Sequence, residues 1–106
     1  MNEVVAAIVR PFASRFSDET AIERNHVISY GNDLWAHAEP ISRAMRPSAR
    51  MAWVVGNAYL QGIEVPTDAY VSAIFRELGW SVQPPIVLRR RHSRSGLVES
   101  VVLLSR

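Results

Sequence analysis

The sequence predicts an α/β fold in one layered domain, with a mostly parallel sheet that ends in an antiparallel hairpin. Short apolar runs typical of strands alternate with one-sided apolar patterns typical of helices, and helical crossovers between strands imply parallel neighbours. The last two extended segments are separated only by the turn residues 93–96, so we expect them to pair antiparallel. A chain of 106 residues has room for one small core.

The N-terminal part has the least regular pattern. Residues 4–9 form an apolar run that ends at Arg10-Pro11, and the residue before a proline favours an extended conformation. We therefore expect a buried strand there, although a run this short is also compatible with a helix. Residues 12–29 mix polar and apolar side chains without a clear period, so we expect a loop with at most one short helix.

Two helices are expected in the remainder of the chain. Asn32 or Asp33 can cap the first, and Pro40 is expected to kink it. The second begins at Pro66-Thr67-Asp68 and ends at Gly79, a residue suited to the left-handed position after a helix. Both carry an apolar stripe at helical spacing. The stripes consist of Leu34, Ala38, Ile41 and Met45 in the first helix and of Val71, Ile74, Phe75 and Leu78 in the second.

Three further segments are predicted to be extended. Residues 51–55 form a strand that ends at Gly56, followed by a loop over residues 57–65. Residues 80–91 are extended but broken by two prolines. Residues 97–105 form the last strand. Its run at 101–104 is apolar on both faces, so we expect this strand to lie inside the sheet.

The composition excludes several kinds of site. Cysteine is absent, which excludes disulfides, thiolate zinc sites and a cysteine nucleophile. His26, His37 and His92 show no metal-ligand spacing, so we expect no metal. No apolar run approaches the roughly 20 residues needed to cross a bilayer. No basic segment precedes residues 4–9 as in a secretory signal, and we expect a cytoplasmic location.

The positive charge is concentrated near the C-terminus. All twelve basic residues are arginine, and the net charge is only +2. Residues 84–98 nevertheless contain four arginines and no acid. Because a guanidinium matches two phosphate oxygens, this cluster is a candidate contact for a nucleic-acid backbone. The alternative is a solvated hairpin tip. The arginines are Arg89, Arg90, Arg91 and Arg94.

Several passages occur in an order that is familiar from a known family. Arg46-Pro47-Ser48-Ala49 precedes the expected strand; residues 56–68 read GNAYLQGIEVPTD, residues 74–80 read IFRELGW, and three arginines follow. Over about residues 32–106 the chain resembles the carboxyl-terminal half of site-specific DNA methylase-like, S-adenosylmethionine-dependent methyltransferases. The resemblance implies a partial Rossmann-like sheet, S-adenosylmethionine as cofactor, and methylation of an exocyclic amine in DNA or RNA.

The chain also departs from that family. The family holds its cofactor with a glycine-rich turn, whereas the five glycines here are widely separated. The cofactor-binding first half of the family fold is missing, so residues 1–106 are expected to form a single partial domain. We expect a fragment or a split subunit that is inactive alone, and the chain by itself is not expected to hold the cofactor. Whether it is an enzyme stays open.

The resemblance and the topology together identify candidate site residues. The family's catalytic motif is Asn, Asp or Ser, then Pro-Pro, then an aromatic residue that stacks on a flipped base. Here only Pro11 and Phe12 match it, and Val9 has no side-chain acceptor. Asn57 and Tyr59 follow a strand end, where α/β folds place ligands, although Asn57 also suits a local turn. The candidate substrate-binding residues are Asn57, Tyr59, Arg89, Arg90, Arg91 and Arg94.

Two classes of function follow from these features. The first is a nucleic-acid amino-methyltransferase fragment or split subunit. The second is a non-catalytic module that binds nucleic acid or a partner protein through the arginine-rich hairpin. The expected partners are nucleic acid and either a separate cofactor-binding subunit or a second copy paired through an exposed edge strand, with no membrane. Trp53 and Trp80 are expected to pack in the core rather than to stack on bases.

Overall fold

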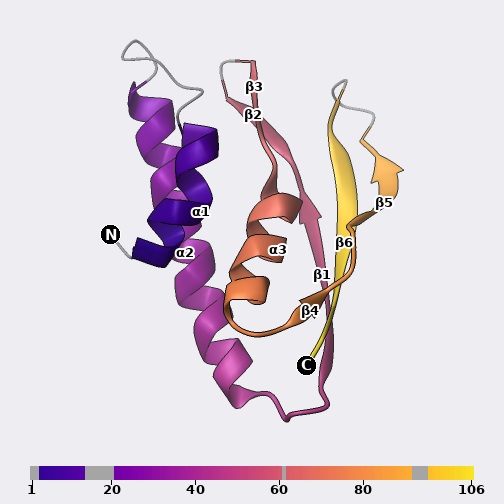
Figure 1. Ribbon diagram of the computed structural model, residues 1–106. Helices are drawn as coiled ribbons and strands as arrows, with labels where there is room; N and C mark the ends of the chain where they lie inside the picture. Colours follow the sequence, from indigo (N-terminus) through magenta and orange to yellow (C-terminus); the bar gives the residue numbers. More distant parts are fainter. Residues whose placement is uncertain (1–2, 14–20, 61, 92–95) are drawn as a thin grey trace.

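The computed structural model describes residues 3–13, 21–60, 62–91 and 96–106 (Figure 1). In these ranges the chain forms three helices and six strands. The helices are α1 (Glu3–Ala13), α2 (Ala21–Ala44) and α3 (Thr67–Glu77). The strands are β1 (Arg50–Gly56), β2 (Ala58–Leu60), β3 (Ile63–Val65), β4 (Ser81–Val82), β5 (Ile86–Arg90) and β6 (Val98–Ser105).

The C-terminal strand β6 is the centre of the main sheet. It pairs antiparallel with β1 on one side, in a regular register from Arg50 opposite Ser105 to Gly56 opposite Glu99. On its other side β6 pairs antiparallel with β4 near its end and with β5 near its beginning. The strands β2 and β3 form a separate antiparallel pair. The expected antiparallel pairing of the last two strands is confirmed, as is the internal place of the last strand.

The prediction of a mostly parallel, partial Rossmann-like sheet is wrong, because every pairing in the main sheet is antiparallel. The crossover through α3 does carry the chain from β1 to β5, and these strands run in the same direction because each is antiparallel to β6. They are not neighbours, however. The strand β6, apolar on both faces, takes the central position between them.

The predicted N-terminal strand is also wrong, because residues 4–9 lie in helix α1. Val5 and Val9 are one helical turn apart and are fully buried, at 0% and 1% exposure. They form a core cluster with Val27 of α2 and Tyr70 of α3. The four-residue spacing of these valines places both on one face of a helix, and this packing outweighs the extended preference before Pro11.

Helix α2 begins well before the predicted caps and continues through Pro40. Asn32 therefore lies inside the helix, where its Nδ2 donates to the carbonyl oxygen of Ile28 at 3.2 Å. Gly31 faces α1 so closely that a Cβ at this position would overlap Cγ2 of Val9. The loop expected over residues 12–29 is helical from Ala21 onward. No described helix is long and apolar enough to span a membrane.

Helix α3 agrees closely with its prediction. Its stripe is buried against the sheet: Val71, Ile74 and Phe75 are at most 1% exposed. Gly79 follows the helix with φ +90°, as expected for a left-handed terminus. At the other end Pro66 occupies the N-cap position without a side-chain cap, so Thr67 is not the cap that the sequence indicated.

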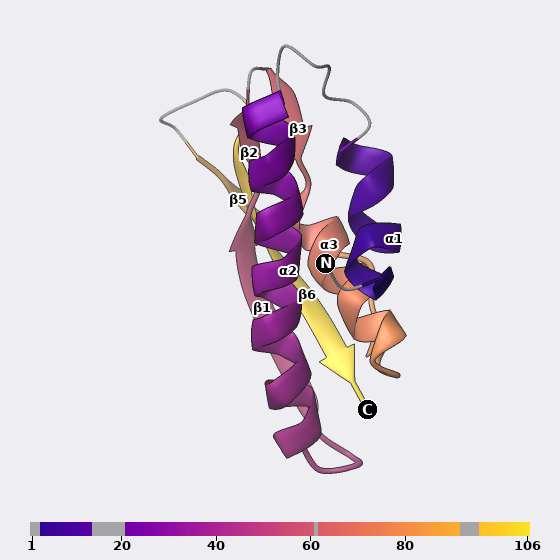
Figure 2. The same ribbon diagram turned by 90° about the vertical axis from the view of Figure 1, so that its left-hand side faces the viewer.

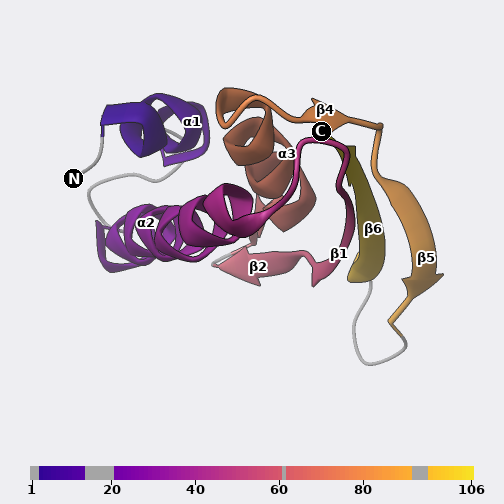
Figure 3. The ribbon, with the colours of Figure 1, turned by 90° about the horizontal axis from the view of Figure 1, so that it is seen from below.

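Helix α3 packs against one face of the main sheet, α2 lies beside β1, and α1 lies farther from the strands (Figure 3). No described helix covers the other face of the sheet. The exposure of β1 alternates accordingly, with Met51, Trp53 and Val55 turned toward the helices. In the core Phe75 contacts the rings of both Trp53 and Trp80, with centroids 5.2 and 5.9 Å away. The prediction that Trp53 and Trp80 pack in the core is confirmed.

Arg106, which follows β6, contacts the C-terminal end of α2 and the Trp80 ring. The Arg106 guanidinium donates to the carbonyl oxygens of Ser42 and Met45 and lies 5.3 Å from the centre of the Trp80 ring. The Trp80 indole N–H donates to the Ser42 hydroxyl oxygen at 2.8 Å. These contacts give hydrogen-bond partners to carbonyl groups at the C-terminal end of α2. They also hold that end of the helix near the start of β1, as the view along α2 in Figure 2 shows.

Candidate functional site

The structure does not place Pro11 and Phe12 at the end of a strand. Both lie in the last turns of α1, and Pro11 is exposed. The expectation of a catalytic motif depended on a strand that leads into these residues. That strand is absent from the described chain, so the structural context for an amine-positioning motif is missing here.

Asn57 lies at the junction of β1 and β2 and uses its whole amide group within the chain. Its Nδ2 donates to Glu64 Oε2 at 2.7 Å and to the carbonyl oxygen of Gly96 at 3.0 Å. Its Oδ1 accepts from the backbone N–H of Val98 at 2.9 Å. The residue is 8% exposed. Asn57 therefore ties β3 and the start of β6 to the end of β1, which is the local structural role that the sequence left open.

Tyr59 lies beside the same junction. It is half-buried on β2, opposite Glu64 in the β2–β3 pair. Gly96 has φ +83°, and a Cβ at this position would lie 2.9 Å from the Tyr59 hydroxyl oxygen. The glycine thus meets two requirements, a left-handed backbone and close approach of a tyrosine. The structure brings Asn57, Tyr59 and the end of the β5–β6 connection together.

The arginines of β5 differ in their surroundings. Arg89 forms a two-point contact with Glu99 on β6, from Nε to Oε2 and from Nη2 to Oε1, both at 3.0 Å. The hydrogen bond from Arg89 is the largest influence on the Glu99 carboxyl and holds its pKa below the ordinary value. The same bond raises the pKa of Arg89. The charge of Arg89 is thereby balanced within the chain.

Arg90 and Arg91 remain exposed at the end of β5. The backbone N–H of Arg91 donates to the carbonyl oxygen of Leu97 at 2.8 Å, which holds this end of the hairpin together. Its Nη1 would lie 4.0 Å from a Cβ at Gly56, so the side chain reaches across β6 toward the end of β1. Arg94 lies outside the described residues. The site that forms is therefore Asn57, Tyr59 and Arg91. Arg90 is paired with Val98 and is exposed.

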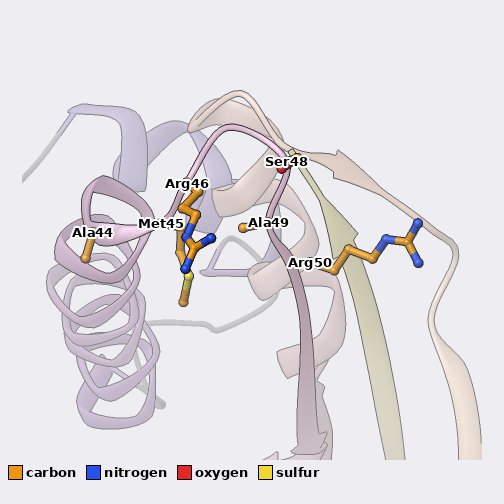
Figure 4. Close-up of a pocket in the computed structure, with 6 residues that line it drawn as sticks. All are labelled: Ala44, Met45, Arg46, Ser48, Ala49 and Arg50. Atoms are coloured by element: carbon orange, nitrogen blue, oxygen red, sulfur yellow. The ribbon is translucent and has the colours of Figure 1, made fainter.

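Two cavities lie elsewhere in the described structure. One, of about 390 Å³, is lined by residues 44–46 and 48–50, where α2 leads into β1. In Figure 4 the Arg46 side chain lies in the space between α2 and β1, whereas Arg50 points away. The second cavity, of about 240 Å³, is lined by His26, Val27, Tyr30, Ala58 and Val65. Neither contains a predicted site residue. The sequence had assigned no binding role to Arg46.

Neither cavity fits S-adenosylmethionine. The family needs glycines for close approach of the backbone and an acid for the ribose hydroxyls, and neither residue type lines these cavities. The described residues also contain no group of three metal-ligating side chains. Exposed arginines and a tyrosine are thus gathered at the end of β1, and neither of the two cavities carries the residue types that hold the family's cofactor.

Comparisons of the chain with protein-family models, with curated proteins and with solved structures find no match. They therefore assign no family. A functional proposal depends on the residues that the structure gathers at the end of β1 and on the sequence passages that contain them.

Proposed function

We propose that the chain is the substrate-side part of a nucleic-acid amino-methyltransferase, and that it acts only with a second chain that binds S-adenosylmethionine. The observation that carries this proposal is the gathering of Asn57, Tyr59 and Arg91 at one end of the sheet. These residues belong to the passages that resemble methylase-like proteins. The proposal uses these residues and does not depend on a parallel sheet.

Each of the three residues has a distinct part in this proposal. Asn57 holds the strand ends in place, because all its hydrogen-bonding groups are engaged. Tyr59 offers an aromatic ring next to the hairpin, suited to contact with a base. Arg91, together with Arg90, offers exposed guanidinium groups to phosphate. Arg89 is excluded from this role because Glu99 already engages it at two points.

The requirement for a second chain is tested by titrating S-adenosylhomocysteine into the purified protein. We expect no heat of binding, because neither of the two cavities described above carries the residue types that hold this ligand. One-to-one binding would contradict the need for a partner.

The methyl transfer itself is tested with a partner chain, encoded by a neighbouring reading frame, that supplies the glycine-rich first half of the family fold. The joint complex should move a labelled methyl group to DNA or RNA. If the complex binds S-adenosylmethionine but the nucleic acid acquires no labelled methyl group, the proposal is wrong.

A second candidate is a module that binds nucleic acid without catalysis, and the exposure of Arg90 and Arg91 favours it. The measurement is the salt dependence of single-stranded DNA binding. Each phosphate contact contributes roughly 0.7 to the slope of log affinity against log salt. A double variant that combines Arg90→Ala and Arg91→Ala should reduce the magnitude of the slope by about 1.4. The control Arg89→Ala should leave the slope nearly unchanged. An unchanged slope in the double variant would show that Arg90 and Arg91 do not contact phosphate. Binding by this chain without methylation by the joint complex would favour the second candidate.

A further inference from the structure

One face of the main sheet, which we call the open face, is apolar at its centre. Because side chains alternate along a strand, the even-numbered residues of β1 lie on the face opposite the helices. No described helix covers that face (Figure 3). The register joins Val54, Val101 and Ile86 in one row across three strands, and Ala52 and Leu103 in the next row. Val54 is 61% exposed and Ile86 50%, whereas the solvent face of an antiparallel sheet is usually polar.

Cations lie at both ends of the open face. At one end β1 begins with the exposed Arg50. At the other end the register forms a row of Gly56, Glu99 and Arg89. Glu99, the one acid among the described residues of this face, is already bonded at two points to Arg89, and the Arg91 side chain reaches toward Gly56. Both ends therefore carry excess positive charge, separated by roughly 20 Å along the strands.

This charge pattern discriminates between the possible occupants. In a twofold dimer the open face would meet itself, so cations would meet cations whichever way the strands run. A nucleic-acid base stacks on an aromatic side chain, and the described residues of the open face include none. A partner with apolar side chains between two acidic ends is complementary to the whole face.

The dimensions of the open face fit a single helix. Strands at a spacing of about 4.8 Å make the face of β1, β6 and β5 roughly 14 Å wide, and a helix with its side chains is about 10–12 Å across. Helices are also the elements that cover sheet faces in layered α/β folds. The roughly 20 Å between the cationic ends corresponds to about 14 residues of helix.

We propose that the open face binds an amphipathic helix of a partner chain, with acidic residues about 14 positions apart and apolar residues between them. The apolar side chains would cover Val54, Ile86 and Leu103. The carboxylates would reach Arg50 at one end and Arg91 at the other. The inference does not depend on the proposed function. Because Arg91 also belongs to the candidate site, Arg50 and Val54 are the residues to change.

The probes are three synthetic peptides of about 18 residues, built of alanine, glutamine and a leucine stripe at helical spacing. The first carries glutamate near both ends, the second carries lysine at the same positions, and the third is the glutamate peptide with a proline at its centre. Isothermal titration should show the glutamate peptide binding roughly tenfold more tightly than the lysine peptide. The proline peptide should not bind, because proline breaks the helix. Equal affinity of the first two peptides, undiminished binding of the third, or no binding of any would overturn the proposal.

Two valines of similar exposure locate the bound peptide. Val54→Gln places an amide in the centre of the open face and should weaken binding of the glutamate peptide roughly tenfold. Val87, at 56% exposure, is paired with the buried Ser100 on the helix side of the sheet, so Val87→Gln is the matched control and should bind normally. Arg50→Gln should weaken binding of the glutamate peptide and leave that of the lysine peptide unweakened. Equal effects of the two valine variants would contradict the proposal.

Sedimentation of the unmodified chain tests the competing occupant, a second copy. We expect a monomer, because the cationic ends of two open faces would repel each other. A dimer that Val54→Gln disperses and Val87→Gln does not would show that a second copy covers the open face, and it would overturn the helix proposal.

Discussion

Replacing Asn57 by alanine should destabilise the chain strongly, although the residue lies between strands and outside the hydrophobic core. The side chain makes three hydrogen bonds, to Glu64, Gly96 and Val98, at 2.7 to 3.0 Å. Alanine removes all three and leaves the backbone N–H of Val98 and the carbonyl group of Gly96 without these partners. The link between β1, β3 and the start of β6 would then be lost.

The expected loss follows from the number of bonds. A typical hydrogen bond contributes about 0.5–1.5 kcal/mol, and a buried group left unpaired costs about 1–3 kcal/mol. Three bonds, one of them to the partly exposed Glu64, give a loss of roughly 2–4 kcal/mol. Native domains are stable by only about 5–15 kcal/mol, so this is a large fraction of the total.

Urea unfolding followed by tryptophan fluorescence and circular dichroism measures this loss. Asn32→Ala is a matched control, because Asn32 makes one bond of 3.2 Å to its own helix. Alanine also favours helix, so the control should change the free energy of unfolding by less than about 0.5 kcal/mol. A loss below about 1 kcal/mol for Asn57→Ala, or a loss equal to that of the control, would refute the reasoning.

Three further substitutions have defined outcomes. Gly31→Ala gains about 1 kcal/mol of helix propensity but forces α1 away through Val9, so its melting temperature should fall; a rise would contradict the close approach. Ser42→Ala removes the acceptor of a buried indole N–H and should cost about 1–3 kcal/mol in urea unfolding. Because Arg89 lowers the pKa of Glu99 in the folded chain, Glu99 contributes stability above the ordinary carboxyl range, and this is lost as the pH falls through the lowered pKa. Arg89→Gln should raise that pKa toward its ordinary value in a carbon-13 NMR titration; an unchanged pKa would show that the contact does not persist in solution.

Elements with a strong local pattern could be predicted from the sequence. The stripe of α3 and its terminal Gly79 define that helix with little help from the rest of the chain. The alternation of β1 and the doubly apolar run of β6 likewise indicate strands, and Val102 of β6 is fully buried as expected. In these segments local preference and tertiary packing agree, so a local argument is sufficient.

The N-terminal helices could not be predicted with the same argument. Residues 4–9 are apolar at every position, so their side chains show no period. The choice between helix and strand depends on packing against Val27 and Tyr70, which lie far along the chain. Asn32 is equally ambiguous, because it caps helices well but also bonds back to a carbonyl within one. The order of strands in the sheet depends on long-range pairing, which no local pattern contains.

The arginines of β5 show how a small irregularity determines the candidate site. The register between β5 and β6 pairs Val87 with Ser100 and then Arg89 with Glu99, so a bulge inserts one residue. Without it Leu88 would lie opposite Glu99, and the next arginines would shift by one position along β6. A one-residue shift moves side chains to the opposite face of a sheet. The bulge therefore decides that Arg89 forms the two-point contact with Glu99, while Arg90 and Arg91 are exposed. A sequence of three consecutive arginines cannot reveal this distinction, because their difference arises from the paired strand.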